Sequence, residues 1–197
     1  MEFVKSNSFC LILLLSIFVT SCSNNDYNPK PRGYFKIDLP KKEYQAYQSD
    51  CPFTFEYPVY SQVITDSARN ARPCWQDVVF PAFNGRIHLS YQPIKSKAEF
   101  NQLVEDAHTF VFKHTVKATA IDESVINMPE KKVYGIYYTI DGNAASPVQF
   151  FLTDSSSNYL RGALYFNEQP HFDSIQPVLD FVKKDIDLMI RSFRWKN

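Results

Sequence analysis

Residues 149–166 read QFFLTDSSSNYLRGALYF, in which two apolar runs lie on either side of a polar segment. The runs are 149–153 and 159–166, and the segment between them, 154–158, contains only Asp, Ser and Asn residues. These residue types favour turns, because their short polar side chains hydrogen-bond to the nearby backbone. The pattern therefore predicts a β-hairpin, and with it a fold that contains an antiparallel sheet.

Further strands are predicted along the chain. Ile87, Leu89 and Tyr91 alternate with polar residues, as in a strand with one buried face. Segment 133–140 is rich in β-branched residues and tyrosine, and 54–60 is rich in aromatic residues but contains a proline at position 58. Proline cannot donate a hydrogen bond to a neighbouring strand, so we expect 54–60 at a sheet edge or a bend.

Two segments have apolar residues at steps of three and four, the spacing of an amphipathic helix. The first is 97–116, which follows Ser96; Ser96 and Glu99 have the spacing of a capping box. The second is 174–192, with Pro177 in its first turn, where a missing N–H costs little.

The order of these elements is strands, a helix, about four strands and a terminal helix. Neighbouring strands joined by short turns predict an α+β fold, a mainly antiparallel sheet packed with two main helices. This order resembles the Mog1/PsbP-like sandwich. No repeat or change of composition follows residue 33, so we expect a single domain over 33–197.

The N-terminus has the pattern of a bacterial lipoprotein signal peptide. Lys5 precedes the apolar run 9–19, and the small residues Thr20 and Ser21 lead to Cys22. The alternative is a membrane-spanning helix that is retained, but a run of 11 residues is short of the roughly 20 that a bilayer requires. We therefore expect removal of 1–21, a lipid on the thiol of Cys22, and a polar, proline-containing tether over 22–32.

Two cysteines remain after the signal peptide and the lipidated residue are set aside. Cys51 and Cys74 form an even pair in an exported protein, which favours a disulfide. Such a bond would stabilise the domain by about 3 kcal/mol. The alternatives are two buried thiols or a metal pair, and no His or Cys lies at ligand spacing near either cysteine.

Composition excludes several classes of function. The chain has 21 basic and 21 acidic residues, so it lacks the basic excess of a nucleic-acid-binding protein. Only 5 of its 197 residues are glycine, and no glycine-rich phosphate loop is found. The 17 Phe and 12 Tyr residues favour a well-packed, sheet-rich domain, and they also motivate the hypothesis of a binding site for a small ligand or glycan.

No set of residues has the spacing of a catalytic or metal site. Glu105 and His108 are three apart on the predicted helix, a spacing more common in surface pairs than in catalysis. A hydrolase would need one of the serines 155–157 beside His88 or His171. The segment 141–143 lacks the alternating carboxylates of a calcium loop and predicts a turn. We therefore predict no catalytic residue, no metal and no cofactor.

The residues expected to contact a partner lie around the hairpin. Asp154 and Arg161 flank its turn, and Asn143 lies in the polar segment before its first strand. We expect the interaction surface at the sheet edges, the 141–148 segment and the 154–158 turn.

Distinctive stretches are spread over the whole chain after Cys22. They are PKPRGYF (29–35), IDLP (37–40), FEYP (55–58), PCW (73–75), IHLSY (87–91), KHT (113–115), GNAASPVQFFLTDSSSNYLRGALYF (142–166) and FRWK (193–196). Together they resemble the gliding motility lipoprotein GldD family of the Bacteroidota. None of them is a catalytic motif, and the resemblance implies no catalytic residue.

The resemblance implies a cell-envelope lipoprotein required for gliding motility and for the associated type IX secretion machinery. The leading hypothesis is a non-catalytic assembly component that binds the membrane through the lipid and binds other envelope proteins. The alternative is a periplasmic module that binds a small ligand or glycan. Residues 23–26 contain a single acid, unlike the acidic signals of surface display in these bacteria, so we expect a periplasm-facing domain on either the inner or the outer membrane.

Overall fold

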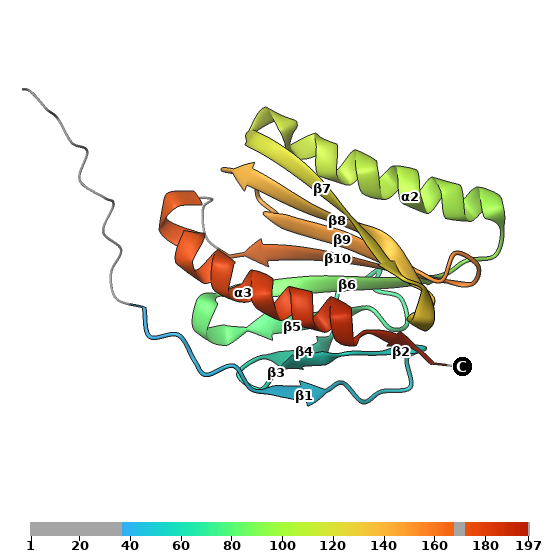
Figure 1. Cartoon of the computed structure of the whole chain (residues 1–197), viewed down its shortest axis with the longest axis horizontal. Coiled ribbons are helices and arrows are strands. Elements are labelled where there is room, and N and C mark those ends of the chain that lie inside the picture. The colour runs from blue at the N-terminus through green and yellow to red at the C-terminus, as the bar shows by residue number, and fades with distance from the viewer. Residues whose placement is uncertain (1–36, 168–171, 197) are drawn as a thin grey trace, which may run out of the picture. The chain divides into compact units, whose positions relative to one another are not determined.

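The computed structural model describes residues 37–167 and 172–196, and a seven-stranded antiparallel sheet is their largest element (Figure 1). Its strand order is β4-β5-β6-β10-β9-β8-β7. The bounds of the strands are β4 (Gln62–Thr65), β5 (Gln76–Phe80), β6 (Gly85–Pro93), β7 (Ala118–Met128), β8 (Val133–Gly142), β9 (Val148–Thr153) and β10 (Asn158–Phe166).

Two small sheets complete the described strands, and the second brings the two ends of the described chain together. β1 (Tyr44–Ala46) pairs with β3 (Glu56–Pro58), and β2 (Phe53–Thr54) pairs with β11 (Arg194–Trp195). A single strand was predicted over 54–60, but the structure has two short strands there, β2 and β3. β3 ends at Pro58, the position of the predicted bend.

The hairpin predicted over 149–166 is confirmed. β9 and β10 pair antiparallel, with Tyr159 opposite Thr153 and Leu164 opposite Val148. β10 pairs on its other side with β6, so the hairpin forms the middle of the sheet. The predicted alternation in β6 is also confirmed, because Ile87 and Leu89 are fully buried while their neighbours are partly exposed.

Both predicted helices are present with shifted ends. α2 (Lys97–Phe112) is followed by a 3-10 turn, η3 (Lys113–Val116), so the single helix predicted over 97–116 changes type near its end. The Ser96 hydroxyl accepts a hydrogen bond from the Glu99 backbone N–H at 3.1 Å, as the capping-box spacing predicts. α3 (Phe172–Ser192) starts two residues earlier than predicted, so Pro177 lies in its second turn rather than its first.

The sheet has a hydrophobic core on each face. α3, Phe53 of β2 and the nearby Phe55 pack on one face, and α3 crosses in front of the central strands in Figure 1. α2 packs on the other face through Ala107 and Val111, against Tyr138, Phe151 and Tyr159 of the sheet. The fold is therefore α+β with mainly antiparallel sheet and two helices, as predicted.

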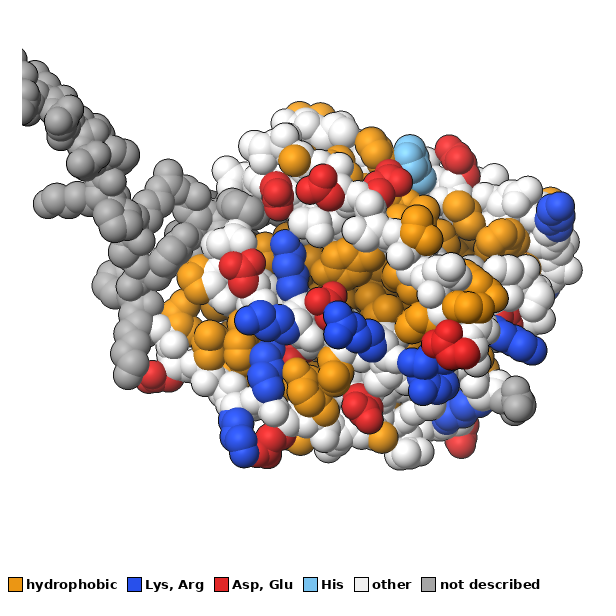
Figure 2. Space-filling view, viewed as in Figure 1, with side chains coloured by type: hydrophobic (Ala, Val, Ile, Leu, Met, Phe, Trp, Pro, Cys, Tyr) orange, Lys and Arg blue, Asp and Glu red, His pale blue; other side chains and the backbone are white. Residues whose placement is uncertain are grey.

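Basic and acidic side chains are interspersed on the side of the molecule that carries α3 (Figure 2). This mixture agrees with the equal numbers of basic and acidic residues in the chain.

Candidate functional site

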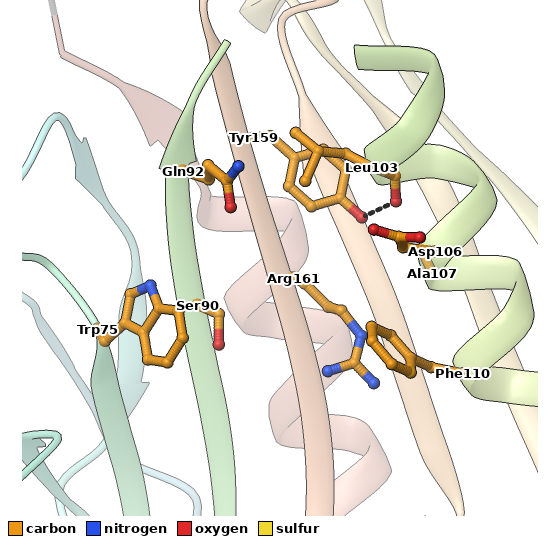
Figure 3. Close-up of a pocket in the computed structure, with 9 residues that line it drawn as sticks. All are labelled: Trp75, Ser90, Gln92, Leu103, Asp106, Ala107, Phe110, Tyr159 and Arg161. Atoms are coloured by element: carbon orange, nitrogen blue, oxygen red, sulfur yellow. Dashed lines mark hydrogen bonds between the residues drawn. The ribbon is translucent and has the colours of Figure 1, made fainter. Parts of the chain in front are cut away.

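A pocket of about 290 Å³ lies between α2 and the central strands (Figure 3). The strands contribute Ser90 and Gln92 from β6, and Tyr159 and Arg161 from β10. The helix contributes the opposite wall, and Trp75, just before β5, lies at one side. The helix residues are Leu103, Asp106, Ala107 and Phe110.

The alternation of β6 and β10 explains why polar side chains of these two strands line the pocket. Side chains of successive strand residues point to opposite faces. On β6, Ile87 and Leu89 are buried with α3, so Ser90 and Gln92 point towards α2. On β10, Leu160 and Leu164 are buried with α3, so Arg161 points towards α2 as well.

Arg161 is held at the edge of the pocket by two contacts. Its guanidinium donates a hydrogen bond to the side-chain oxygen of Gln149 on β9, and it lies 4.8 Å from the centre of the Phe110 ring. No carboxylate lies within 4.0 Å of it in the parts of the chain that the structure describes. Burial, and in addition the charge of Arg161, lower the pKa of His114 below its usual value.

The opposite wall carries a carboxylate. Asp106 accepts a hydrogen bond from the Gln102 side chain at 2.8 Å, and none of the described Lys, Arg or His residues lies within 4.0 Å of it. Next to Asp106 in Figure 3, the Tyr159 hydroxyl donates a hydrogen bond to the Leu103 carbonyl at 3.1 Å. Burial raises the pKa of Tyr159, so this hydroxyl remains a neutral donor.

Trp75 is positioned by the residue before it. Cys74 has a φ of +63°, in the left-handed region that residues other than glycine rarely adopt, and the structure joins it to Cys51 by a disulfide. The Trp75 indole N–H donates a hydrogen bond to the Tyr91 carbonyl at 3.0 Å. Because its only polar group has this partner, the indole ring offers the pocket an apolar surface.

A second polar cluster lies on the same face of the sheet, outside the pocket. The Asp77 carboxylate lies 2.5 Å from the His88 Nδ1 and 3.3 Å from an Arg86 guanidinium nitrogen. A carboxylate beside an imidazole is part of many hydrolytic sites. Such a site also needs a nucleophilic side chain that hydrogen-bonds to the other nitrogen of the histidine. Among the described residues no Ser, Thr or Cys hydrogen-bonds to His88. Ala163 lies opposite His88, and the nearest serine of the 154–158 turn, Ser157, is six residues away along the chain, about 20 Å.

A family model matches residues 24–195 of the chain, and its description is gliding motility lipoprotein GldD. The chain belongs to the gliding motility lipoprotein GldD family. It is therefore a lipoprotein of the cell envelope, anchored to a membrane by lipid, and a protein of gliding motility.

Among solved structures, this GldD-family chain is similar to cyanobacterial PsbP (CyanoP) from Synechocystis sp. PCC 6803. The solution structure of that protein matches with a TM-score of 0.50 and 11% sequence identity, covering 82% of this chain and 97% of the other. This likeness confirms the predicted PsbP-like fold. No curated protein sequence matches the chain at a significant level.

No helix in the described ranges of this GldD-family chain is both long and apolar enough to cross a bilayer. The lipid-bearing residue predicted from the sequence, Cys22, lies outside the described residues, as does His171.

The structure separates the three predicted interaction residues of the GldD-family chain. Asn143 directly follows β8 and Asp154 directly follows β9, and Tyr134 on β8 lies opposite Thr153 on β9. Nine residues along β8 therefore separate the two positions, about 30 Å. Arg161 lies in the pocket, on the face of the sheet. Asp154 accepts hydrogen bonds from the backbone N–H groups of residues 156, 157 and 158 at 2.8–2.9 Å, so its contacts are those of a turn-forming residue.

The histidines on or next to α2 do not converge. His108 stacks on the ring of Phe112 and lies 4.0 Å from the Glu123 carboxylate. His114 instead interacts electrostatically with Arg161. Among residues 37–167 and 172–196, no three His, Cys, Asp or Glu side chains come together as a metal site.

Sequence reasoning named Arg161 but missed the other polar residues of the pocket. Trp75, Gln92 and Asp106 come from three separate segments of the chain, and none of them belongs to a spacing motif. The one signal in the sequence is the position of Trp75 next to Cys74, because a disulfide at that position restrains the tryptophan.

Proposed function

We propose that this lipoprotein is a non-catalytic assembly component of the gliding apparatus and of the associated type IX secretion machinery. In this proposal the lipid is on Cys22, the tether over 22–32 holds the domain near the membrane, and the domain faces the periplasm. The domain acts by binding another envelope protein of the apparatus.

The observation that supports this proposal is the outer edge of β7, which pairs with no other strand among the described residues. This strand has eleven residues, pairs with β8 on one side, and is the last strand in the order of the sheet. Val125, near its middle, is 81% exposed. A long edge strand with exposed apolar residues is a template for pairing with a strand of another protein, and soluble proteins usually block such edges.

The chemistry of this edge favours an extended segment of a partner. Main-chain N–H and C=O groups along β7 would provide the affinity, as in other cases of β-strand addition. The side chains of Asp122 and Glu123 add negative charge at the middle of the strand and favour a partner strand with basic residues.

The proposal is tested by substituting a lysine for an exposed residue of β7. Val125→Lys places a charge where a partner strand would pair, and we expect cells that carry it to stop gliding while the protein remains folded and abundant. The matched control is Ile64→Lys on β4, the opposite edge of the sheet, where the residue is also exposed. Normal gliding by the Val125→Lys strain, or loss of gliding in both strains, would contradict the proposal.

A photo-crosslinking residue at position 125 in living cells then identifies the partner. The expected result is a crosslink to a protein of the gliding or secretion apparatus that is absent when the residue is placed at position 64. Mass spectrometry of the mature protein tests the anchor: an unprocessed leader or a free thiol at Cys22 would overturn that part of the proposal.

A further inference from the structure

The pocket between α2 and the strands β6 and β10 contains two opposite charges that do not pair with each other. Asp106 on α2 and Arg161 on β10 both line it, and they are not within 4.0 Å of each other. Each is held by a different neutral amide, Asp106 by Gln102 and Arg161 by Gln149. The pocket therefore presents an acceptor and a donor on separate walls.

The guanidinium of Arg161 is held in a fixed position in which it can bind an anion. Gln149, which holds it, is 2% exposed, and the amide nitrogen of Gln149 has no hydrogen-bond partner among the described residues. The Phe110 ring restrains the guanidinium from the other side. A partly buried guanidinium without a counter-ion is unfavourable, and a carboxylate matches its planar donors.

The remaining lining residues suit a ligand with several hydroxyl groups. The Asp106 carboxylate accepts hydrogen bonds from hydroxyls, and Ser90 and Gln92 offer further polar groups. The indole of Trp75 provides an apolar surface, and in Figure 3 Ser90 lies between this ring and Arg161. The pocket of about 290 Å³ has the volume of roughly ten water molecules, enough for one sugar ring.

We propose that this pocket binds a sugar acid, with the carboxylate on Arg161, hydroxyls on Asp106, Ser90 and Gln92, and the C–H face of the ring against Trp75. A neutral sugar leaves Arg161 without a counter-ion. An amino acid pairs with both charges but leaves Ser90 and Gln92 unmatched, and an apolar ligand leaves every polar group unmatched. The site is distinct from the outer edge of β7 and does not depend on it.

The test is binding to the full-length lipoprotein in detergent micelles, measured by calorimetry and by saturation-transfer NMR. The probes are glucuronate, glucose, and glutamate. We expect glucuronate to bind about tenfold or more tightly than glucose, because a charged hydrogen-bond pair accounts for at least that factor. We also expect it to bind more tightly than glutamate, which pairs with Arg161 but leaves Ser90 and Gln92 unmatched. Equal binding of glucose and glucuronate, preferred binding of glutamate, or no binding of glucuronate at millimolar concentration would overturn the proposal.

Variants assign the binding to this pocket. Arg161→Met is expected to weaken glucuronate binding tenfold or more, and Arg161→Lys, which keeps the charge, to restore part of it. The matched control is Lys113→Met, which removes a cation that also lies over the Phe110 ring, at 5.1 Å, but does not line the pocket. Glucuronate binding that is unchanged by Arg161→Met, or weakened equally by Lys113→Met, would place the ligand elsewhere and contradict the proposal.

Asp106→Asn provides a second variant in case Arg161→Met does not fold. It should weaken the binding of glucuronate but not change the preference for glucuronate over glucose, because the carboxylate partner remains. A glucuronate-terminated oligosaccharide distinguishes the two sources of the ligand: tighter binding than that of the monosaccharide indicates a glycan, and equal binding indicates a free sugar acid.

Discussion

The ammonium of Lys42 lies 2.6 Å from the carboxylate of Asp185, whose side chain is 1% exposed. Two tyrosine hydroxyls donate to the same carboxylate, Tyr44 at 2.9 Å and Tyr60 to its second oxygen. Lys42 also lies 3.3 Å from the centre of the Phe181 ring. One buried carboxylate on α3 therefore holds the beginning of the described chain.

Asp185→Ala is expected to destabilise the domain by about 3–5 kcal/mol. The substitution leaves the Lys42 ammonium and two tyrosine hydroxyls without their acceptor, and removing one partner of a buried pair has an effect of this size. The measurement is the free energy of urea unfolding. The control is Asp187→Ala, two residues further along α3 and exposed. Equal losses in the two variants would contradict the role given to Asp185.

The same carboxylate predicts a loss of stability at alkaline pH. Burial, and then the hydrogen bond and charge of Asp185, raise the pKa of Tyr44 to about 12 and raise the pKa of Tyr60 as well. In the unfolded chain these hydroxyls ionise near pH 10, so their contribution is fully present below pH 10. It is lost as the pH rises from 10 through the raised pKa values of the folded state, which for Tyr44 is about 12.

The effect of Lys42 on the free energy of unfolding changes with pH in the direction opposite to that of the two tyrosines. Burial lowers the pKa of its ammonium, so its contribution increases with pH up to the ordinary value of 10.5. A fall in the free energy of unfolding between pH 10.5 and 12 is therefore assigned to tyrosines. The double variant Tyr44→Phe/Tyr60→Phe should show a smaller fall than the wild type. An equal fall in both proteins would contradict the assignment.

The sequence predicts most of the fold because the strongest patterns are local. The hairpin over 149–166 and both amphipathic helices have periodicities that follow directly from burial on one face. The sequence predicts about four strands after the first helix, and β7 to β10 are four, but it assigns no segment to β7. This strand lies at the sheet edge, where most of its side chains are exposed and no alternation is required. β5 was also missed because its polar residues, Gln76 and Asp77, are buried.

The pocket could not be predicted in the same way. Its polar residues come from segments about 70 residues apart, and the pairing of β6 with β10 brings them together. For Asp154 the sequence predicted a functional contact that the structure does not require. Its position beside a turn suggested a contact residue, and its hydrogen bonds are to the turn itself.

We expect the contribution of Asp154 to the stability of the domain to depend on pH in the acid range. Burial alone would raise the pKa of its carboxyl, but hydrogen bonds from residues 157, 158 and 156 outweigh burial and hold the pKa below its usual value. The contribution of Asp154 is therefore present above the ordinary carboxyl pKa, near 4, and is lost as pH falls through the lower pKa of the folded state.

Asp154→Ala should lower the free energy of unfolding at pH 7 by about 1–3 kcal/mol, the usual effect of losing hydrogen bonds to a charged group. Urea unfolding at pH 7 and pH 3 measures it, and the variant should lose less stability on acidification than the wild type. Asp122→Asn, at an exposed position of β7, is the control and should change neither quantity. A variant that keeps the full acid dependence would show that other carboxyls account for it.

Gly135 on β8 is required by the close approach of the neighbouring strand. A Cβ at this position would lie 1.8 Å from the backbone oxygen of Phe151, which cannot move without disrupting the sheet. Gly135→Ala should destabilise the domain by about 3 kcal/mol or more.

Gly85→Ala is the matched control for Gly135→Ala. Its Cβ would lie 3.0 Å from the ring of Phe166, a side chain that can shift, and 3.5 Å from the backbone oxygen of Tyr165, an ordinary contact distance. We expect a change below about 1 kcal/mol, measured by urea unfolding. If the two alanine variants were equally stable, the contact with Phe151 would not be the constraint on this position.

The disulfide between Cys51 and Cys74 should stabilise the domain and hold Trp75 in place. The bond closes a loop with a sequence separation of 23 residues, for which the chain-entropy estimate is about 3 kcal/mol. The double variant Cys51→Ser/Cys74→Ser should lose this amount in urea unfolding, and reduction of the wild type should give the same loss. In a Trp195→Phe background, Trp75 is the remaining tryptophan. Its emission should shift to longer wavelength on reduction, as the indole becomes more exposed to water. Unchanged emission with reduced stability would show that the bond stabilises the domain without positioning Trp75.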